Sequence, residues 1–567
     1  MGDTHIQPGH SRSGVPDCES GGGPLDLDDL RPIAEVLDKR AAETPQKPFV
    51  IFPDHDNLTY TYAELKQLAE RTAYALHYLG IQAGDRVAIT LPNSPQAVTS
   101  WFGCLVGGFV DTTISADLRG ESLRYAVAKV GASAVITDVD HLDAVLDAVS
   151  TAEVPVQILC HGYAGSAVAA GGGGASVRDL DEATAAAPAC GLAPAAIDAL
   201  SSIRFTSGST GMPKGIMMSP GHMRASAQMF CVLTETGADD VIYTPFPLHH
   251  VLSSVTGLLA TLEAGATISL ARKFSASRFW AHIAQVGATI AQGLDPTIAI
   301  LSKADPKPTD RDNTVRCMYT AAGEFREFEE RFGIRLVRLF DMSELTAVAH
   351  YRPGEERRPG SCGRESDLFE ARIADTHDRI LPAGAVGELV VRPKAPNVMM
   401  LGYYGDAEKT LQQWQNLWFH TGDTGLLDED GYLYFKGRAS DRIRHRGVNV
   451  SPEQVEAEAA AHPAIADCAA IAVPSDVIED EVKLCVQLTP EASDISIEQL
   501  ASELDTMMSD HHRPRYVEVY DTLPRTDTQK LRKGVLRAEG EHGLTARTWD
   551  TAERRWAVPP NPDRPAA

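Results

Sequence analysis

The feature that most constrains the fold is an alternation of helical and strand-like segments along most of the chain. Residues 65–80 (LKQLAERTAYALHYLG) have helical spacing and end at a glycine, whereas 86–93 and 133–138 are short apolar runs that predict strands. Because strands that alternate with helices form largely parallel sheets covered by those helices, we expect a layered α/β fold. At 567 residues, the chain is long enough for more than one domain.

The composition changes after residue 447, and this change predicts a small second domain. Beyond it, the pattern predicts a helix at 452–461, strands at 467–473 and 482–488, and a helix at 496–510. This is an α+β arrangement of about 100 residues, a common domain size. We therefore expect four parts: a disordered N-terminal tail at 1–27, a large domain of layered α/β subdomains at 28–438, a mobile C-terminal α+β domain at 439–548, and a flexible tail at 549–567.

The composition argues against several classes of function. The chain has 52 basic and 77 acidic residues and a formal net charge of −25, which disfavours nonspecific binding to nucleic acid or to an anionic membrane. There is no run of about 18 apolar residues and no apolar segment near the N-terminus, so we expect neither membrane insertion nor a signal peptide. Nine cysteines without a CxxC pair predict reduced thiols in a cytoplasmic enzyme.

A glycine- and hydroxyl-rich loop at 205–215 (FTSGSTGMPKG) is the first candidate for a binding site. Glycines let backbone N–H groups approach an anion closely, the hydroxyl groups add donors, and Lys214 adds a positive charge. The loop differs from a Walker loop because two residues separate Gly211 from Lys214. On these residues alone, a phosphate cradle and a flexible linker both remain open.

A series of short segments runs along most of the chain in a characteristic order. They are 58–98, the loop at 205–215, FPLHH (246–250), FDMSE (340–344), FHTGD (419–423), GRASDRIRHRGVNVSPEQVE (437–456) and PRTDTQKLRK (524–533). In this order they resemble the signatures of the acyl- and aryl-adenylating superfamily, which includes acyl-CoA synthetases, luciferases and peptide-synthetase adenylation domains. The last two segments are most similar to those of carnitine/crotonobetaine-type CoA ligases.

The resemblance implies a site for ATP and Mg²⁺. The residues expected to bind its phosphates are Thr206, Ser207, Gly208, Ser209, Thr210, Gly211 and Lys214. Glu344, together with Thr206, is expected to hold Mg²⁺, a hard cation that prefers oxygen ligands.

The resemblance also implies residues for the adenine and the ribose. Phe340, which stands where tyrosine is usual, would stack on adenine, and Asp341, Met342 and Ser343 would line the same part of the site. Asp423 and Arg438 would bind the ribose, where a carboxylate suits paired hydroxyl donors.

Lys530 is the residue that the resemblance assigns most directly to catalysis. Its positive charge would offset the repulsion between the carboxylate of the acid and the α-phosphate of ATP. His250 occupies the position of the motif histidine, where it would gate or shape the acid pocket, although a purely structural role is equally open. Gly447 would let the pantetheine of CoA pass, and the pivot of the C-terminal domain falls at Ser440 or Asp441.

Some positions depart from the usual pattern of the superfamily. Asp341 replaces a glycine, and Gln529 stands where glycine is common. The segments 111–120 and 320–333 also differ from the usual acid-pocket segments. Glu324 in the second segment either contacts a polar or amine-bearing substrate or points to solvent.

These features predict an ATP- and Mg²⁺-dependent ligase that activates a small or polar acid as an acyl-adenylate, releases pyrophosphate and forms a CoA thioester. The expected partners are ATP, CoA and a small-molecule acid, and a homodimer is open. Three other functions also remain open: loading of a carrier protein, ATP-dependent diazotisation that activates nitrite for an aryl amine, and noncatalytic nucleotide binding. Lys530 and Glu344, which are both present, argue against the last of these.

Overall fold

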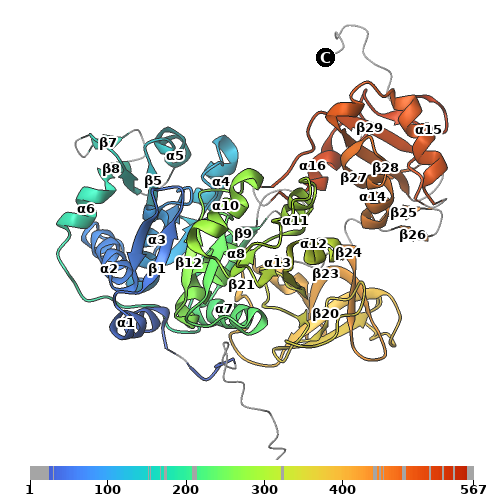
Figure 1. Ribbon diagram of the computed structural model, residues 1–567. Coiled ribbons are helices and arrows are strands. Elements are labelled where there is room, and N and C mark those ends of the chain that lie inside the picture. Colours follow the sequence, from blue (N-terminus) through green and yellow to red (C-terminus); the bar gives the residue numbers. More distant parts are fainter. Residues whose placement is uncertain are drawn as a thin grey trace, which may run out of the picture.

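The structure is a computed structural model (Figure 1). It describes residues 25–557 apart from positions 30, 151, 153–154, 166–167, 171–174, 207–213, 321–324, 439–442, 446–447, 451, 476–479, 510–511, 527–528 and 541–542. Figure 1 shows a large region that ends at strand β24 and a smaller C-terminal region, coloured orange to red.

A nine-stranded sheet carries the glycine-rich loop between two of its strands. Its order is β21–β10–β9–β4–β3–β5–β6–β8–β7. The strands are β3 (Arg86–Ile89), β4 (Val110–Thr113), β5 (Ala134–Asp138), β6 (Gln157–His161), β7 (Val168–Ala170), β8 (Ala175–Asp179), β9 (Ser202–Thr206), β10 (Lys214–Met218) and β21 (Gly402–Tyr403). The centre of the sheet is parallel, whereas β9 and β10 are antiparallel on either side of the loop.

A seven-stranded sheet has the order β15–β14–β13–β11–β12–β1–β2 and is parallel except for β2. The strands are β1 (Pro48–Phe52), β2 (Leu58–Thr61), β11 (Val241–Thr244), β12 (Thr267–Leu270), β13 (Ile290–Gln292), β14 (Cys317–Tyr319) and β15 (Arg335–Val337). Two parallel-rich sheets confirm the α/β prediction for this region.

Helices accompany both sheets. They are α1 (Ile33–Glu43), α2 (Tyr62–Tyr78), α3 (Pro95–Gly107), α4 (Gly120–Val130), α5 (Leu142–Val149), α6 (Leu180–Ala186), α7 (Pro220–Thr234), α8 (Val251–Ser253), the π-helical Ser254–Leu259, α9 (Ala260–Ala264), α10 (Ala276–Val286), α11 (Asp295–Ser302) and α12 (Arg326–Phe332). Helix α2 begins at a capping box in which Thr61 and Glu64 satisfy each other's backbone N–H groups.

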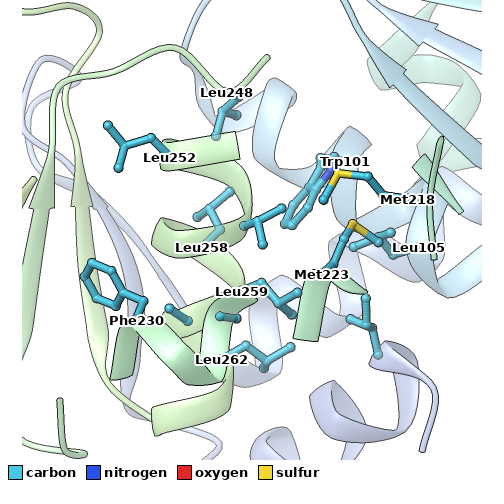
Figure 2. Packing of buried hydrophobic residues seen from close by; sticks show 14 of the residues in the cluster. Trp101, Leu105, Met218, Met223, Phe230, Leu248, Leu252, Leu258, Leu259 and Leu262 are labelled. Atoms are coloured by element: carbon cyan, nitrogen blue, oxygen red, sulfur yellow. The ribbon is translucent and has the colours of Figure 1, made fainter. Parts of the chain in front are cut away.

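One hydrophobic core joins the two sheets through these helices. Figure 2 shows Trp101 and Leu105 of α3 near Met223 of α7, with Leu258 and Leu259 next to them and Phe230 of α7 on the other side of these leucines. The segment α3 is buried along nearly its whole length. Since such close packing resists deformation, it fixes the strand ends that carry the motif segments.

Two smaller sheets complete the large region. A three-stranded sheet contains β16 (Leu339–Phe340), β17 (Ala349–His350) and β18 (Arg364–Glu365). An antiparallel sheet contains β19 (Phe369–Ala374), β20 (Gly387–Pro393), β22 (Trp414–Gln415), β23 (Trp418–Leu427) and β24 (Leu433–Arg438), and α13 (Ala407–Gln413) precedes β22.

The C-terminal region is a mixed sheet with helices, and it has cores of its own. Its elements are β25 (Ile443–His445), β26 (Val448–Val450), α14 (Pro452–Ala460), β27 (Ile465–Pro474), β28 (Asp480–Leu488), a 3-10 turn (Pro490–Ala492), α15 (Ile497–Met507), β29 (Tyr516–Tyr520), α16 (Lys533–Ala538), β30 (Trp549–Asp550) and β31 (Arg555–Trp556). The predicted helices and strands all occur within a few residues of their expected bounds. Lys303, after α11, donates a hydrogen bond from Nζ to the Ala466 carbonyl (2.7 Å) and so links the two regions.

Two predicted boundaries are wrong. Leu25 and Leu27 pack against the main core, so the folded region begins before residue 28. Residues 549–557 do not form a flexible tail, because β30 and β31 extend the C-terminal sheet. Trp549 is 8% exposed and its ring lies 5.3 Å from that of Trp556, and this aromatic burial stabilises the segment.

Candidate active site

Two of the motif segments follow strands of the seven-stranded sheet. Strands β11, β13, β14 and β15 are parallel, so their carboxyl ends meet at the same edge. FPLHH (246–250) follows β11, and FDMSE (340–344) begins in β16, directly after β15. In α/β proteins, ligands bind in the crevice beyond this edge of a sheet.

Glu344 is held by residues near the end of the nine-stranded sheet. Tyr403 in β21 donates a hydrogen bond from Oη to Glu344 Oε1 (3.0 Å), and the Met400 N–H donates to the Glu344 carbonyl (2.8 Å). Lys214 in the neighbouring strand β10 places Nζ 5.3 Å from the centroid of the Tyr403 ring. Two predicted residues, Glu344 and Lys214, therefore contact the same tyrosine, which no motif had singled out.

The residues expected to bind the ribose and the adenine either lie in strand β24 or contact it. Asp423 in β23 and Arg438 in β24 are cross-strand partners. Asp423 is 3% exposed, and its backbone N–H donates to Thr421 Oγ1 (3.0 Å). Phe340 is 7% exposed, and its ring lies 5.7 Å from that of Phe435 in β24. Phe340 is thus part of the core, and its stacking on adenine stays a prediction.

His250 has a structural role that the geometry makes plain. It is the N-cap of α8, where Nδ1 accepts a hydrogen bond from the Leu252 N–H (3.2 Å). The helix continues as the π-helical segment Ser254–Leu259, a geometry that is frequent at functional sites. Gln292 donates from Nε2 to the Leu252 carbonyl (2.8 Å) and helps to hold this segment. A gating role for His250 stays a prediction.

Lys530 lies in a tight turn that leaves its side chain exposed. The Thr526 N–H donates to the Lys530 carbonyl (2.8 Å), and the Lys530 N–H donates to Thr526 Oγ1 (3.1 Å). Gln529 has φ 67°, a left-handed conformation that glycine adopts without steric cost. The expected glycine position is therefore left-handed here as well, and the turn presents Lys530 to its surroundings.

Asp341 contacts the end of the neighbouring strand. Tyr319, the last residue of β14, donates a hydrogen bond from Oη to Asp341 Oδ2 (3.2 Å). Burial raises the pKa of Asp341, while the positive charge of Lys530 and the Tyr319 hydrogen bond oppose that rise. The residue as a whole is exposed. Lys530, in the C-terminal region, is near enough to the FDMSE segment for its charge to oppose the rise in the pKa of Asp341.

Several predicted residues lie outside the described part of the chain. They are Ser207, Gly208, Ser209, Thr210, Gly211, Glu324, Ser440, Asp441 and Gly447. For Thr206 and Arg438 the structure describes the backbone, at the ends of β9 and β24 respectively. Met342 and Ser343 are half-buried between Phe340 and Glu344.

A buried ion pair lies directly before the glycine-rich loop, and sequence reasoning missed it. Asp111 in β4 accepts hydrogen bonds from Arg204 Nη1 (3.0 Å) and Ser202 Oγ (2.8 Å), both in β9, which leads into the loop. Trp101 Nε1 (3.0 Å) and Thr113 Oγ1 (2.6 Å) also donate to this carboxylate. Asp111 and Arg204 are 0% and 1% exposed. The unusual start of the segment 111–120 therefore anchors β9, and an acid directly after the apolar residues Phe109 and Val110 was the available signal.

Among the residues that the structure describes, no helix has the length and apolar character needed to cross a membrane.

Comparisons with known proteins find matches along most of the chain. The family described as "AMP-binding enzyme" matches residues 37–404, and "AMP-binding enzyme C-terminal domain" matches 454–530. The chain is 30% identical over 513 residues to the crotonobetaine/carnitine–CoA ligase of Salmonella typhi, covering 89% of this chain and 98% of that protein. The enzyme of the same name from Salmonella paratyphi A has the same identity and coverage.

Solved structures show the same fold. ATP-bound MatB from Rhodopseudomonas palustris superposes with a TM-score of 0.77 at 25% identity, covering 89% of this chain and 98% of that one. A benzoate CoA ligase from Burkholderia xenovorans LB400 has a TM-score of 0.76 at 23% identity, covering 90% and 100%. These matches confirm the predicted fold class, a large N-terminal region with a small C-terminal one.

Proposed function

Because the chain belongs to the family of AMP-binding enzymes, we propose that it is an AMP-forming ligase that joins a carboxylic acid to CoA. The relatives matched over nearly their whole length are CoA ligases. The observation that carries the proposal is that Glu344 and Lys214, from two motif segments far apart in the chain, contact the same residue, Tyr403.

The first half-reaction requires two anions to approach each other. A carboxylate oxygen of the acid attacks the α-phosphorus of ATP, the bond between that phosphorus and the bridging oxygen breaks, and pyrophosphate leaves. Lys530 offsets the repulsion between carboxylate and α-phosphate, and Lys214 stabilises the charge that accumulates on the leaving phosphates. Asp423 and Arg438 orient the ribose.

The second half-reaction transfers the acyl group. The CoA sulfur, as a thiolate, attacks the acyl carbon of the adenylate, the C–O bond to the phosphate breaks, and AMP leaves. The chain supplies a separate C-terminal region for this step, and Gly447 would border the pantetheine path.

The donor set around Glu344 fits Mg²⁺. Its Oε1 accepts the Tyr403 hydrogen bond, and among the described residues no protein group pairs with Oε2. A free carboxylate oxygen is a ligand that this cation prefers. Mg²⁺, when bound by Glu344 and Thr206, would neutralise phosphate charge.

The acid is proposed to be small or polar.

The compartment is proposed to be reducing. The described cysteines are all unpaired, and all but Cys190 are buried. Burial raises the pKa of thiols such as Cys317, to about 11, and keeps them unreactive.

The test is a pyrophosphate-release assay with ATP and Mg²⁺ across aliphatic, aromatic, amino and betaine acids, first without and then with CoA. We expect pyrophosphate and enzyme-bound acyl-AMP without CoA, and AMP with an acyl-CoA after CoA is added. ADP and phosphate as products would exclude this chemistry. An adenylate that transfers to a carrier protein but never to CoA would exclude CoA as the acceptor.

A further inference from the structure

Two ion pairs tie the turn that carries Lys530 to the rest of the C-terminal region, one on each side of the turn. Before it, Arg525 pairs through Nη2 with Asp467 in β27. After it, Lys533 at the start of α16 places Nζ 2.6 Å from Oε1 of Glu456 in α14. Both pairs are partly buried and are therefore screened less than exposed pairs. They resist a shift of the turn relative to β27 and α14.

Arg525 also binds the backbone of the turn itself. Its Nη1 donates a hydrogen bond to the carbonyl of Gln529, the residue directly before Lys530, and its backbone forms a bridge with Leu531. A planar guanidinium holds two acceptors in a fixed geometry, which an ammonium group does not. Arg525 therefore connects the peptide bond that precedes Lys530 to Asp467.

The large region contacts the same end of β27. Lys303, after α11, donates from Nζ to the carbonyl of Ala466 (2.7 Å), which directly precedes Asp467. Figure 1 shows α11 beside the C-terminal region. A series of contacts thus leads from the large region through β27 and Arg525 to the backbone of Lys530. The place of Lys530 relative to the large region depends on each of these contacts.

We propose that Arg525 and Asp467 are positioning residues that hold Lys530 for adenylation, and that Lys303 docks this assembly against the large region. The proposal rests on the ligase function proposed above, in which Lys530 offsets the repulsion between the carboxylate and the α-phosphate. A displaced cation loses much of this effect, because a transition state is stabilised by charges that are already in place. Thioester formation begins from an acyl-adenylate without a free carboxylate, so the three residues act on the first half-reaction.

The experiment measures the two half-reactions separately in single-turnover assays. Pentanoate, benzoate, 4-aminobutanoate and 4-(trimethylammonio)butanoate are tested with the wild-type enzyme, and the acid with the fastest pyrophosphate release is used for every variant. Arg525→Met should slow acyl-adenylate formation roughly 10-fold, while thioester formation from supplied acyl-adenylate changes less than about twofold. Asp467→Asn leaves the contact with Gln529 and should slow adenylation roughly fivefold. Lys303→Met should slow it roughly threefold, because an exposed contact is weak.

A double-mutant cycle distinguishes positioning from a general structural role. If Arg525 acts through Lys530, Arg525→Met should have no further effect on adenylation in a Lys530→Ala background. A variant that merely weakens the fold would slow adenylation by the same factor in both backgrounds. Melting temperatures show whether each variant is folded, and Asp467→Asn tests the same contact if Arg525→Met is not.

Two matched controls make the same kinds of substitution elsewhere. Lys307→Met replaces an exposed lysine close to Lys303 in the chain. Arg555→Met removes an exposed ion pair with Glu553 in the C-terminal region. Both controls should leave the rate of adenylation unchanged.

Three results would overturn the positioning role while the ligase function stands. They are unchanged adenylation in Arg525→Met and Asp467→Asn, equal slowing of both half-reactions, and the same effect of Arg525→Met with and without Lys530. Unchanged adenylation in Lys303→Met would overturn the docking role. If the wild-type enzyme releases no pyrophosphate with any acid, the ligase function itself fails, and this inference fails with it.

Discussion

The ion pair between Asp111 and Arg204 should contribute strongly to the stability of the large region. Asp111→Asn would leave the Arg204 guanidinium at 1% exposure without an opposite charge. Removal of one partner from a buried pair costs about 3–5 kcal/mol, because the remaining charge stays out of water. That is a large part of the about 5–15 kcal/mol that stabilises a typical domain. We therefore expect Asp111→Asn to remove a large part of the unfolding free energy of the large region.

Urea unfolding measures this loss. Trp101 is buried and donates to Asp111, so tryptophan fluorescence reports on this part of the core, and far-UV circular dichroism provides a second probe. Asp367→Asn is the matched control, because its ion pair with Arg352 (3.1 Å) is on the surface, with the aspartate side chain 82% exposed. Such pairs contribute about 0–1 kcal/mol.

Removal of both charges should restore part of the lost stability. Asp111→Leu combined with Arg204→Met removes both charges, and an apolar replacement of a buried pair is often neutral. The double variant should lose less unfolding free energy than Asp111→Leu and Arg204→Met lose together. The difference should be roughly 2 kcal/mol or more. Equal destabilisation by Asp111→Asn and Asp367→Asn, or a double variant whose loss equals the sum of the two single losses, would refute this role of the ion pair.

Three further outcomes are expected. Lys530→Ala should slow acyl-adenylate formation by roughly 10²-fold or more, while thioester formation from supplied acyl-adenylate changes less. Single-turnover assays measure the two steps separately. An equal fall in the rates of both steps would disprove the assignment. Gln529→Gly should stabilise the C-terminal region by about 0.5–1 kcal/mol in thermal unfolding, because φ 67° strains any side chain, and a lower melting temperature would contradict this. Burial lowers the pKa of His222 from 6.5 to about 4. As the pH falls, His222 therefore takes up a proton in the unfolded chain at a higher pH than in the folded one. Stability should fall as the pH drops from 6.5 to 4. His222→Gln should flatten that fall in urea midpoints measured across this range, and an unchanged slope would count against the His222 explanation.

The sequence predicts best what is local. Helix α2 and strand β28 follow from the spacing of apolar residues in short windows. Glu344 and Lys530 were located by short strings of residues, and the contacts of Glu344 with Tyr403 then depend on the pairing of β10 with β21. Such pairing joins residues far apart in the chain, so no short stretch of sequence contains both strands of the pair.

The same limit explains the two largest misses. Asp111 looked like a departure in the acid pocket, but its partner Arg204 is 93 residues away. The segment that contains Trp549 was predicted to be a flexible tail, whereas it pairs with β29 and its tryptophan contacts Trp556. The sequence shows the residue types in each case, and only the folded chain shows which of them meet.

The separate cores on either side of residues 439–442 make this chain a natural candidate for recombination. The apolar clusters of the C-terminal region contain only residues from Ile443 onward, and those of the large region end before it. A crossover placed between Arg438 and Ile443 would exchange whole hydrophobic units and leave no side chain packed against a foreign neighbour within either core. Contacts between the two regions, such as that of Lys303 with the Ala466 carbonyl, would need to be matched. Hybrid enzymes made at this junction would separate the origin of acid selection from that of the acyl-transfer step.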